Sequence, residues 1–299
     1  QGVYWMRFLE TAGMSGLLAD EMGLGKTLQT LTWLSLSRTA GAPHLPSLIV
    51  CPTSLVRNWE AEAEKFTPWM RTLVISGPDR ARDFRKIDSA DIVITSYALL
   101  QRDFEEAWAG RDFSAVVLDE AQHIKNRQTK NAKAVKMLSS AKRLVLTGTP
   151  VENSVADVWS LENFLNPGFL GDRKSFSDRF VKPLQLDEKS VAGKRLSRAL
   201  EPFILRRTKD DRAIAGELGE KREIKEYCIL APRSRAEYES ALDDYRSGER
   251  RHGDMFALIT RLKLICNGPG KFERLFELLE TVFASGESAL VFTQYAKTG

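Results

Sequence analysis

A glycine-rich segment that ends in a lysine and a threonine stands near the start of the chain. Gly23-Leu24-Gly25-Lys26-Thr27 follows an apolar run and opens an amphipathic stretch. Glycines let successive backbone N–H groups point at one anion, and the N-terminus of a helix attracts negative charge. Lys26 is expected to reach the β- and γ-phosphates of ATP, and the Thr27 hydroxyl to coordinate Mg²⁺. The predicted phosphate site comprises Asp20, Gly23, Leu24, Gly25, Lys26, Thr27 and Leu28.

One position departs from the general phosphate-loop pattern. That pattern has a glycine six residues before the lysine, whereas this chain has Asp20 there. A glycine turn beside a surface lysine therefore remains the alternative interpretation. The position of the segment between a predicted strand and a predicted helix favours the phosphate loop.

Two adjacent acids form the second chemical signal. Asp119 and Glu120 directly follow the apolar run Val116-Val117-Leu118. A carboxylate at the tip of a buried strand can hold Mg²⁺, commonly through water, and the next carboxylate can orient and deprotonate an attacking water. We assign Asp119 to the metal and Glu120 to the general base. A solvated strand end is the alternative, but three apolar runs between Lys26 and these acids favour the catalytic pair.

The elements that must position these groups are short apolar runs, each followed by an amphipathic stretch. Runs rich in β-branched residues without polar alternation are typical of strands buried on both faces. Six strand–helix repeats predict an α/β fold with a parallel, doubly wound sheet. The runs are Leu17-Leu18-Ala19, Leu48-Ile49-Val50-Cys51, Thr72-Leu73-Val74-Ile75, Ile92-Val93-Ile94-Thr95, Val116-Val117-Leu118 and Leu144-Val145-Leu146. Helices are expected at Lys26–Arg38, Leu55–Phe66 and Lys130–Leu138.

Polar residues follow several of these runs. In a parallel sheet the carboxyl ends of the strands lie on one edge, where ligands bind. We therefore expect these residues to gather along one rim. They are Asp20, Pro52-Thr53-Ser54, Thr95-Ser96-Tyr97, Asp119-Glu120 and Thr147-Gly148-Thr149.

The pattern changes after Pro150. Two further strands are expected at Ile224–Leu230 and Ala289–Thr293. Helices are expected at Val155–Leu165, Ala192–Leu200, Arg233–Arg246, Met255–Cys266 and Lys271–Phe283. Trp5, Trp33, Trp59 and Trp159 occupy helical apolar positions, which favours core packing over stacking on nucleic-acid bases.

Composition narrows the class of protein but does not identify it. The 299 residues are 43% hydrophobic and 28% charged, which is ordinary for a globular protein and unlike a disordered one. No apolar run approaches the roughly 18 residues of a membrane span. Three cysteines without zinc-type spacing are typical of free thiols in a reducing compartment. A net charge of +4 supports a polyanionic partner only weakly.

Five segments, in this order, resemble the motifs of Swi/Snf-type ATPases. The phosphate loop of that family has Asp at the position of Asp20, which accounts for the departure noted above. The segments are Leu18–Thr27 (LADEMGLGKT), Asp119–Asn126 (DEAQHIKN), Leu146–Pro150 (LTGTP), Phe203–Lys209 (FILRRTK) and Leu264–Asn267 (LICN). The resemblance implies helicase superfamily two architecture, with two RecA-like lobes, ATP in the cleft between them and double-stranded DNA across both. Such proteins translocate along duplex DNA, generally without separating its strands.

The resemblance also implies roles for further residues. Gln122 joins Lys26, Asp119 and Glu120 in the catalytic set, where it couples the nucleotide to motion. Pro52-Thr53-Ser54 and Thr95-Ser96-Tyr97 are implied to contact the DNA backbone, with strand-end capping as the alternative for their hydroxyls. Thr147, Gly148 and Thr149 would link the phosphate site to DNA. Arg206 and Arg207 would brace the two lobes, with a solvated pair as the alternative.

The expected organisation follows from the same resemblance. Residues 1–230 are expected to form the first lobe, with a helical protrusion near 166–200. Residues 231–299 are expected to hold linker helices and the truncated beginning of the second lobe. Because the arginines of that lobe lie outside these 299 residues, we expect the chain to bind ATP-Mg²⁺ but to hydrolyse it slowly by itself.

The function predicted for the parent protein is an ATP-dependent double-stranded DNA translocase that remodels or displaces DNA-bound proteins. The expected partners are double-stranded DNA and a DNA-bound protein complex, without a membrane. A monomer is expected, located in the cytoplasm or nucleoid of a prokaryote or in a nucleus. Two alternatives remain: a strand-separating helicase, and a nucleotide-gated scaffold whose ATPase is vestigial.

Overall fold

The computed structural model describes residues 1–37, 43–124, 128–148, 155–187, 190–209, 224–247 and 254–295. The chain divides into two compact units, Gln1–Gly219 and Glu220–Gly299. Every residue of the predicted phosphate and metal sites lies in the first unit. The boundary expected at residue 230 stays a prediction.

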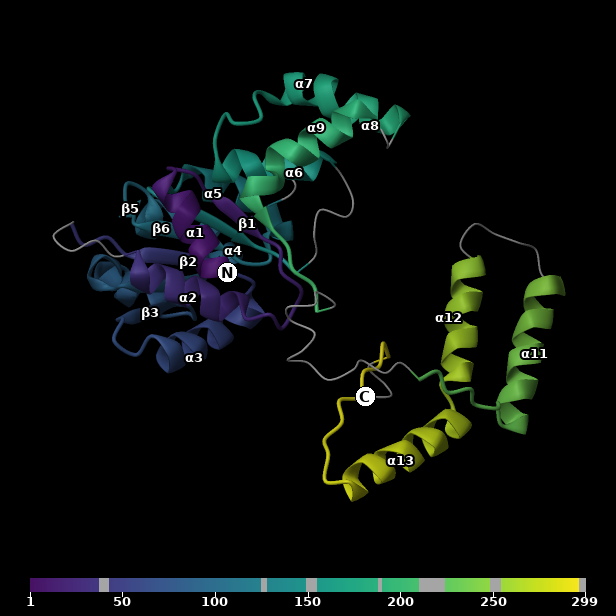
Figure 1. Ribbon diagram of the computed structural model, residues 1–299. Helices are drawn as coiled ribbons and strands as arrows, with labels where there is room; N and C mark the ends of the chain where they lie inside the picture. Colours follow the sequence, from purple (N-terminus) through teal and green to yellow (C-terminus); the bar gives the residue numbers. More distant parts are fainter. Residues whose placement is uncertain are drawn as a thin grey trace. The chain divides into compact units, whose positions relative to one another are not determined.

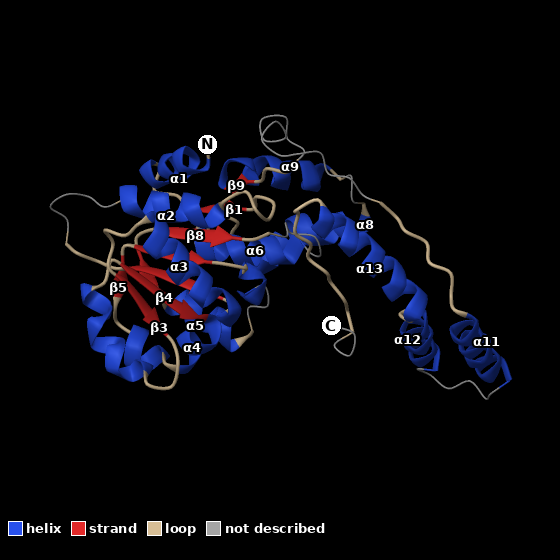
Figure 2. Cartoon of the chain, turned by 90° about the horizontal axis from the view of Figure 1, so that it is seen from below, coloured by secondary structure: helices blue, strands red, loops and turns tan. Residues whose placement is uncertain are grey.

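A parallel sheet of seven strands forms the centre of the first unit (Figure 2). The strands lie in the order β3-β4-β2-β6-β8-β1-β9, and each described pairing between neighbours is parallel. They are β1 Gly16–Leu18, β2 Ser47–Cys51, β3 Thr72–Ile75, β4 Ile92–Ser96, β6 Ala115–Leu118, β8 Arg143–Leu146 and β9 Ile204–Leu205. A separate pair joins β5 Asp112–Phe113 to β7 Ser139–Ser140. The predicted α/β fold and all six predicted strands are confirmed.

Strand β9 is the one strand of this sheet that the apolar runs do not predict. It has only two residues, Ile204 and Leu205, which pair with Leu17 and Leu18 of β1. A run this short carries no periodicity of its own. Strand β9 matters for the site because the residues that follow it lie beside the phosphate loop.

Helices cover both faces of the sheet (Figures 1 and 2). Side chains alternate between the faces along each strand, so Ile49 and Cys51 of β2 pack under α1 to α3, whereas Leu48 and Val50 pack under α4 to α6. The six helices described on these faces are α1 Gly2–Thr11, α2 Lys26–Leu36, α3 Val56–Phe66, α4 Tyr97–Arg102, α5 Lys130–Met137 and α6 Val155–Leu165. Burial on both faces explains why the strands lack polar alternation.

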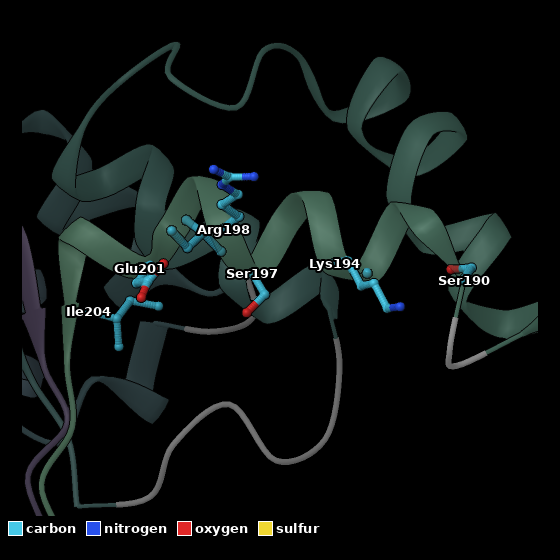
Figure 3. Close-up of a pocket in the computed structure, with 8 residues that line it drawn as sticks. Ser190, Lys194, Ser197, Arg198, Glu201 and Ile204 are labelled. Atoms are coloured by element: carbon cyan, nitrogen blue, oxygen red, sulfur yellow. The ribbon is translucent and has the colours of Figure 1, made fainter.

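Three further helices of the first unit carry a small core of their own. They are α7 Arg173–Phe176, α8 Lys182–Leu186 and α9 Val191–Leu200. Phe176, Phe180, Leu196 and Leu200 pack there with Trp159 of α6. A hollow of about 870 Å³ lies beside α9 (Figure 3). Lys194 and Arg198 extend from α9 in different directions there, so these cations do not converge on one ligand.

The second unit has three described helices and no described strand. They are α11 Pro232–Ser247, α12 Asp254–Cys266 and α13 Pro269–Ala284. The strands expected at 224–230 and 289–293 are wrong, because both segments lack a hydrogen-bonded neighbouring strand among the described residues. Leu290 and Phe292 are 85% and 88% exposed, whereas the prediction buried them. None of the described helices has the length and apolar character needed to cross a membrane.

A buried carboxyl on α6 gives the fold a dependence on pH. Burial raises the pKa of Glu162 to about 7, although a hydrogen bond from Asn166 Nδ2 at 2.6 Å opposes this. Because the pKa of Glu162 in the folded state lies above its ordinary value of 4.5, this group stabilises the fold most below pH 4.5. The stabilisation is lost as the pH rises through about 7.

Replacing Glu162 with glutamine should therefore remove that pH dependence. As the pH rises from 4.5 to 8, the wild type should lose stability that Glu162→Gln retains. The difference in free energy of unfolding between the two proteins should change by up to about 3 kcal/mol in favour of the variant. Urea unfolding at several pH values measures this difference. Equal pH dependence in both proteins would contradict the assignment of a buried, titrating carboxyl.

Candidate nucleotide and nucleic-acid site

Three neighbouring strands, β6, β8 and β1, bring the chemical residues to one stretch of the sheet edge. A Cβ atom built on Gly148 would lie 3.9 Å from Glu120 Oε1 and 4.0 Å from Lys26 Nζ. The residues that follow β1, β6 and β8 therefore face one small space. The expectation that these loops gather on one rim is met by this geometry.

The phosphate loop has the backbone that its glycines permit. Gly23 and Gly25 have φ angles of 90° and 70°, in the left-handed region that favours glycine. Gly25 is the N-cap of α2, which begins at Lys26. A Cβ at Gly25 would meet only open space, so the loop leaves room for a ligand at the positive end of the helix.

Lys26 is held in place by the loop itself. Its Nζ donates to the carbonyl oxygen of Asp20 at 2.8 Å. Burial lowers the pKa of Lys26, and the nearby carboxylates of Asp119 and Glu120 oppose that shift. A half-buried cation that faces two acids and a glycine loop is suited to bind the phosphates of a triphosphate.

Asp20 plays a structural part that its position in the motif did not reveal. Its carboxylate is fully buried and pairs with the Arg207 guanidinium through two nitrogens. The backbone N–H of Arg207 also donates to Asp20 Oδ1 at 3.1 Å. Gln29 joins the pair, since its Oε1 accepts from Arg207 Nη2 at 2.6 Å. The Asp20 side chain thus anchors the phosphate loop to the segment after β9.

The two residues of the basic pair Arg206-Arg207 differ in solvent exposure. Arg206 is exposed, as the alternative of a solvated pair implies, but Arg207 is half-buried against Asp20. The solvated alternative is therefore wrong for Arg207. A brace between lobes stays a prediction for both.

The same segment makes a second set of contacts with the phosphate loop. The Glu21 N–H donates to the Arg207 carbonyl at 2.9 Å, and the Lys209 N–H donates to Glu21 Oε2 at 2.8 Å. Lys209 Nζ lies 3.5 Å from where a Cβ of Gly23 would be. The sequence indicated neither Lys209 nor Gln29 as part of the site. The one signal for Lys209 was its place at the end of the FILRRTK motif, and Gln29 had no signal in the sequence.

Asp119 is a buried carboxylate with two hydrogen bonds. Trp59 Nε1 donates to its Oδ2 at 2.8 Å, and the Glu120 N–H donates to its Oδ1 at 2.9 Å. Burial raises the pKa of Asp119 despite the hydrogen bond from Trp59. Trp59 was predicted as a core residue, which its 1% exposure bears out, but its N–H contact with Asp119 was not predicted.

Glu120 has a strained backbone. Its φ of 49° makes it the one described non-glycine residue in the left-handed region. Such conformations cost of order 1–3 kcal/mol and concentrate at functional sites. The half-buried Glu120 carboxylate faces the same space as Lys26 and Gly148. Gln122 lies in the following exposed turn, beside His123.

The last two residues of β4 and the first residue of α4 use their hydroxyls in hydrogen bonds within the fold. Thr95 Oγ1 donates to the Ile75 carbonyl at 3.1 Å, and Ser96 caps α4 by accepting from the Leu99 N–H. The Tyr97 hydroxyl donates to the Asp119 carbonyl at 2.9 Å, and burial raises its pKa well above the ordinary value. All three are buried, so the structure favours capping, the alternative to DNA contact, for these hydroxyls.

A groove lies at the same edge of the sheet, over β3, β4 and β2. It measures about 670 Å³, and its lining includes Thr53, Arg57, Ser76, Arg80, Ser96 and Arg102. Arg80 is bound to Asp103 through two nitrogens at 2.6 Å, whereas Arg102 is mostly exposed. Thr53 and Ser54 are exposed and Pro52 is half-buried, so these three remain candidates for DNA contact.

The predicted sensor segment after β8 is described only in part. Thr147 is buried, and its N–H donates to the Leu18 carbonyl at 3.2 Å. Gly148 faces Lys26 and Glu120, as given above. Thr149 lies outside the described residues.

The residues present fit a magnesium ion bound together with a nucleotide. Mg²⁺ prefers oxygen ligands and is commonly bound by one or two carboxylates with substrate phosphates and water. Asp119 is a buried carboxylate at the strand tip, and Thr27 directly follows Lys26 at the start of α2. These two side chains would hold the ion, which would neutralise phosphate charge.

Comparisons with known proteins agree with this geometry. The family model described as SNF2-related domain matches residues 1–271. The Sulfolobus solfataricus SWI2/SNF2 ATPase core in complex with dsDNA has a TM-score of 0.69 and is 39% identical. This similarity covers all of this chain and 66% of that one, and it confirms the RecA-like fold.

Curated relatives are longer than this chain. It is 35% identical over its whole length to the putative ATP-dependent helicase/translocase YwqA of Bacillus subtilis. It is 40% identical, over 71% of its length, to the TATA-binding protein-associated factor mot1 of Schizosaccharomyces pombe. The chain spans 35% and 12% of the lengths of these relatives, respectively. The sequence motifs, the fold and the family match agree: the chain belongs to the SNF2-related domain family.

Proposed function

We propose that this chain is the ATP-binding part of an ATP-dependent motor that translocates along double-stranded DNA and remodels or displaces proteins bound to it. The observation that carries the proposal is the convergence of Lys26, Glu120 and Gly148 on one space, with Asp119 adjacent. These groups come from three separate loops, and a lysine, a carboxylate and a glycine that face one space suit the binding of a nucleotide phosphate. The names of the relatives, ATP-dependent helicase and SWI2/SNF2 ATPase core, support the same activity.

Each group has a defined task in ATP hydrolysis. The phosphate loop and Lys26 bind the β- and γ-phosphates, which places the γ-phosphorus near Glu120. The Glu120 carboxylate accepts a proton from a water whose oxygen attacks the γ-phosphorus, and the bond between that phosphorus and the β,γ-bridging oxygen breaks to release ADP. Asp119 and Thr27 would hold Mg²⁺, which would stabilise the negative charge of the phosphates. Gln122 is proposed to couple this site to movement.

Duplex DNA is proposed to bind at the neighbouring groove. Thr53 and Ser54 offer exposed hydroxyls beside it, and Arg57 and Arg102 offer guanidinium groups. Contacts of this kind bind phosphates and fix position without reading sequence. The similar Sulfolobus core was solved with dsDNA, which supports the same ligand for this chain.

A pair of assays on the longest natural protein that contains this chain separates the alternatives. A duplex translocase displaces a third strand from a triplex in an ATP-dependent manner without producing single strands from the duplex. Unwinding of the duplex would favour a strand-separating helicase. Absence of DNA-stimulated ATP hydrolysis would favour a scaffold with a vestigial ATPase.

Removing the lysine of the phosphate loop should abolish most nucleotide affinity. Lys26→Ala is expected to weaken binding of a fluorescent ATP analogue by roughly 30- to 1,000-fold, because charge-assisted hydrogen bonds worth about 2–4 kcal/mol in total are lost. Isothermal titration calorimetry or fluorescence titration of the 299-residue chain measures the dissociation constant of the analogue. Exposed Lys133 on α5 provides the matched control, and Lys133→Ala should bind as the wild type does.

Slow hydrolysis by the 299-residue chain alone remains a prediction, as do its monomeric state and its location in the cell. Steady-state hydrolysis with and without duplex DNA tests the first. Rapid, DNA-stimulated turnover by the isolated chain would contradict it.

A further inference from the structure

We propose that Trp59 and Tyr97 are positioning residues that couple DNA in the groove to the magnesium-binding carboxylate Asp119. The inference rests on the proposed function, because it needs both a DNA groove and a nucleotide site. It goes beyond that function by assigning the physical route between them. The route consists of two aromatic side chains that reach one residue from opposite faces of the sheet.

Asp119 lies between the nucleotide site and the groove along the carboxyl edge of the sheet. Its strand, β6, lies between β8, on the nucleotide side, and β2, on the groove side. Its own N–H donates to the Val50 carbonyl of β2 at 2.9 Å. In the order of the strands, Asp119 therefore lies between the loops of the groove and the phosphate loop.

Trp59 contacts Asp119 from the α1–α3 face. It projects from α3, three residues after Val56, which lines the groove together with Thr53. The indole is 1% exposed, so it is fixed by core packing, and its Nε1 donates to Asp119 Oδ2 at 2.8 Å. The first turn of α3 faces the groove while its inner face holds one of the two carboxylate oxygens.

Tyr97 contacts Asp119 from the α4–α6 face. It is the first residue of α4, and the groove is lined by Ser96 just before it and by Leu99 just after it. The buried Tyr97 hydroxyl donates to the Asp119 carbonyl at 2.9 Å. Its ring stacks on His123 with centroids 5.0 Å apart, next to Gln122.

The two contacts restrain different parts of Asp119. Trp59 sets the direction of the carboxylate, whereas Tyr97 restrains the peptide that leads into Glu120, whose φ of 49° is strained. Both helices begin at the groove, so a phosphate backbone that binds there presses on the two first turns together. A small rotation of either helix then changes the orientation of Asp119 and Glu120.

The test is the coupling between DNA and nucleotide in the 299-residue chain. The dissociation constant of a fluorescent, non-hydrolysable ATP analogue with Mg²⁺ is measured with and without a short duplex. In the wild type, DNA is expected to change it by about 5-fold or more. Trp59→Phe and Tyr97→Phe each delete one hydrogen-bond donor and should reduce this ratio, and the double variant should bring it to about 1.

Trp108→Phe is the matched control. Trp108 is also buried, but its Nε1 has no hydrogen-bond partner among the described residues, so the same change of ring size deletes no hydrogen bond. It should retain the wild-type ratio. Tyr97→Phe removes only one oxygen atom, so it tests the proposal even if Trp59→Phe does not fold.

The outcomes separate this inference from the proposed function. A wild-type chain that binds neither ATP nor DNA contradicts the function itself. A wild type that binds both with a ratio of 1, or variants that keep the ratio of Trp108→Phe, overturn the coupling route while the function stands. A lower ratio in both single variants, with Trp108→Phe unchanged, supports the route.

Discussion

Arg207→Ala is expected to lower the free energy of unfolding by about 3–5 kcal/mol, because it leaves the fully buried Asp20 carboxylate without its ionic partner. The Asp20 side chain receives the Arg207 guanidinium, its backbone N–H and a weak contact from Gln29 at 3.4 Å. After the substitution, the last two donors cannot compensate a buried charge. Urea unfolding of the two proteins at neutral pH measures the loss.

The neighbouring arginine supplies the control for this prediction. Arg206 is exposed, so Arg206→Ala should change stability by no more than about 0.5 kcal/mol. Asp20→Asn combined with Arg207→Ala should recover part of the loss, since the buried charge is removed together with its partner. Equal effects of the two single arginine substitutions would show that Asp20 is not held as the structure describes.

The ion pair between Asp20 and Arg207 is a feature of the phosphate loop that could not be predicted from the sequence. The glycines and Lys26 were predictable, because a loop that binds phosphate needs a left-handed backbone and a cation at a fixed spacing. Asp20 and Arg207 are far apart along the chain, and no local pattern says that they meet. Their contact depends on β9 pairing with β1, and a two-residue strand has no recognisable period.

The sheet was predictable for a different reason. Strands buried on both faces consist of uninterrupted apolar residues, so six of the seven could be located by composition alone. The same criterion failed at 289–293, where an apolar run remains exposed without a neighbouring strand in the described part of the chain. An apolar run specifies what a segment would bury, but a strand forms only where a partner offers hydrogen bonds.

Side-chain direction limited the prediction of the DNA-contacting residues. Thr53 and Ser54 remain exposed, whereas the hydroxyls of Thr95, Ser96 and Tyr97 are directed into the fold. Both triplets lie at the end of a strand and have similar chemistry, so the same role was predicted for both. The difference arises because Ser96 caps α4 and Tyr97, the first residue of that helix, points into the core, which only the three-dimensional arrangement shows.

The largest effect on catalysis is expected from Glu120→Gln, which should lower the rate of ATP hydrolysis by about 10²–10⁴-fold, the usual contribution of a general base. The amide has nearly the same shape as the carboxylate but cannot accept the proton of the attacking water. Nucleotide affinity should be retained, because Lys26 and the phosphate loop are unchanged. Single-turnover hydrolysis and analogue binding, measured on the longest natural protein that contains this chain, separate the two quantities.

Two comparisons make the Glu120 experiment specific. Glu64→Gln, an exposed position on α3, removes a charge of the same type and should leave the rate unchanged. Loss of analogue binding in Glu120→Gln would instead assign the residue to ground-state binding. A rate within a few-fold of the wild type would exclude Glu120 as the general base. The strained backbone of Glu120 and its position near Lys26 would then need another explanation.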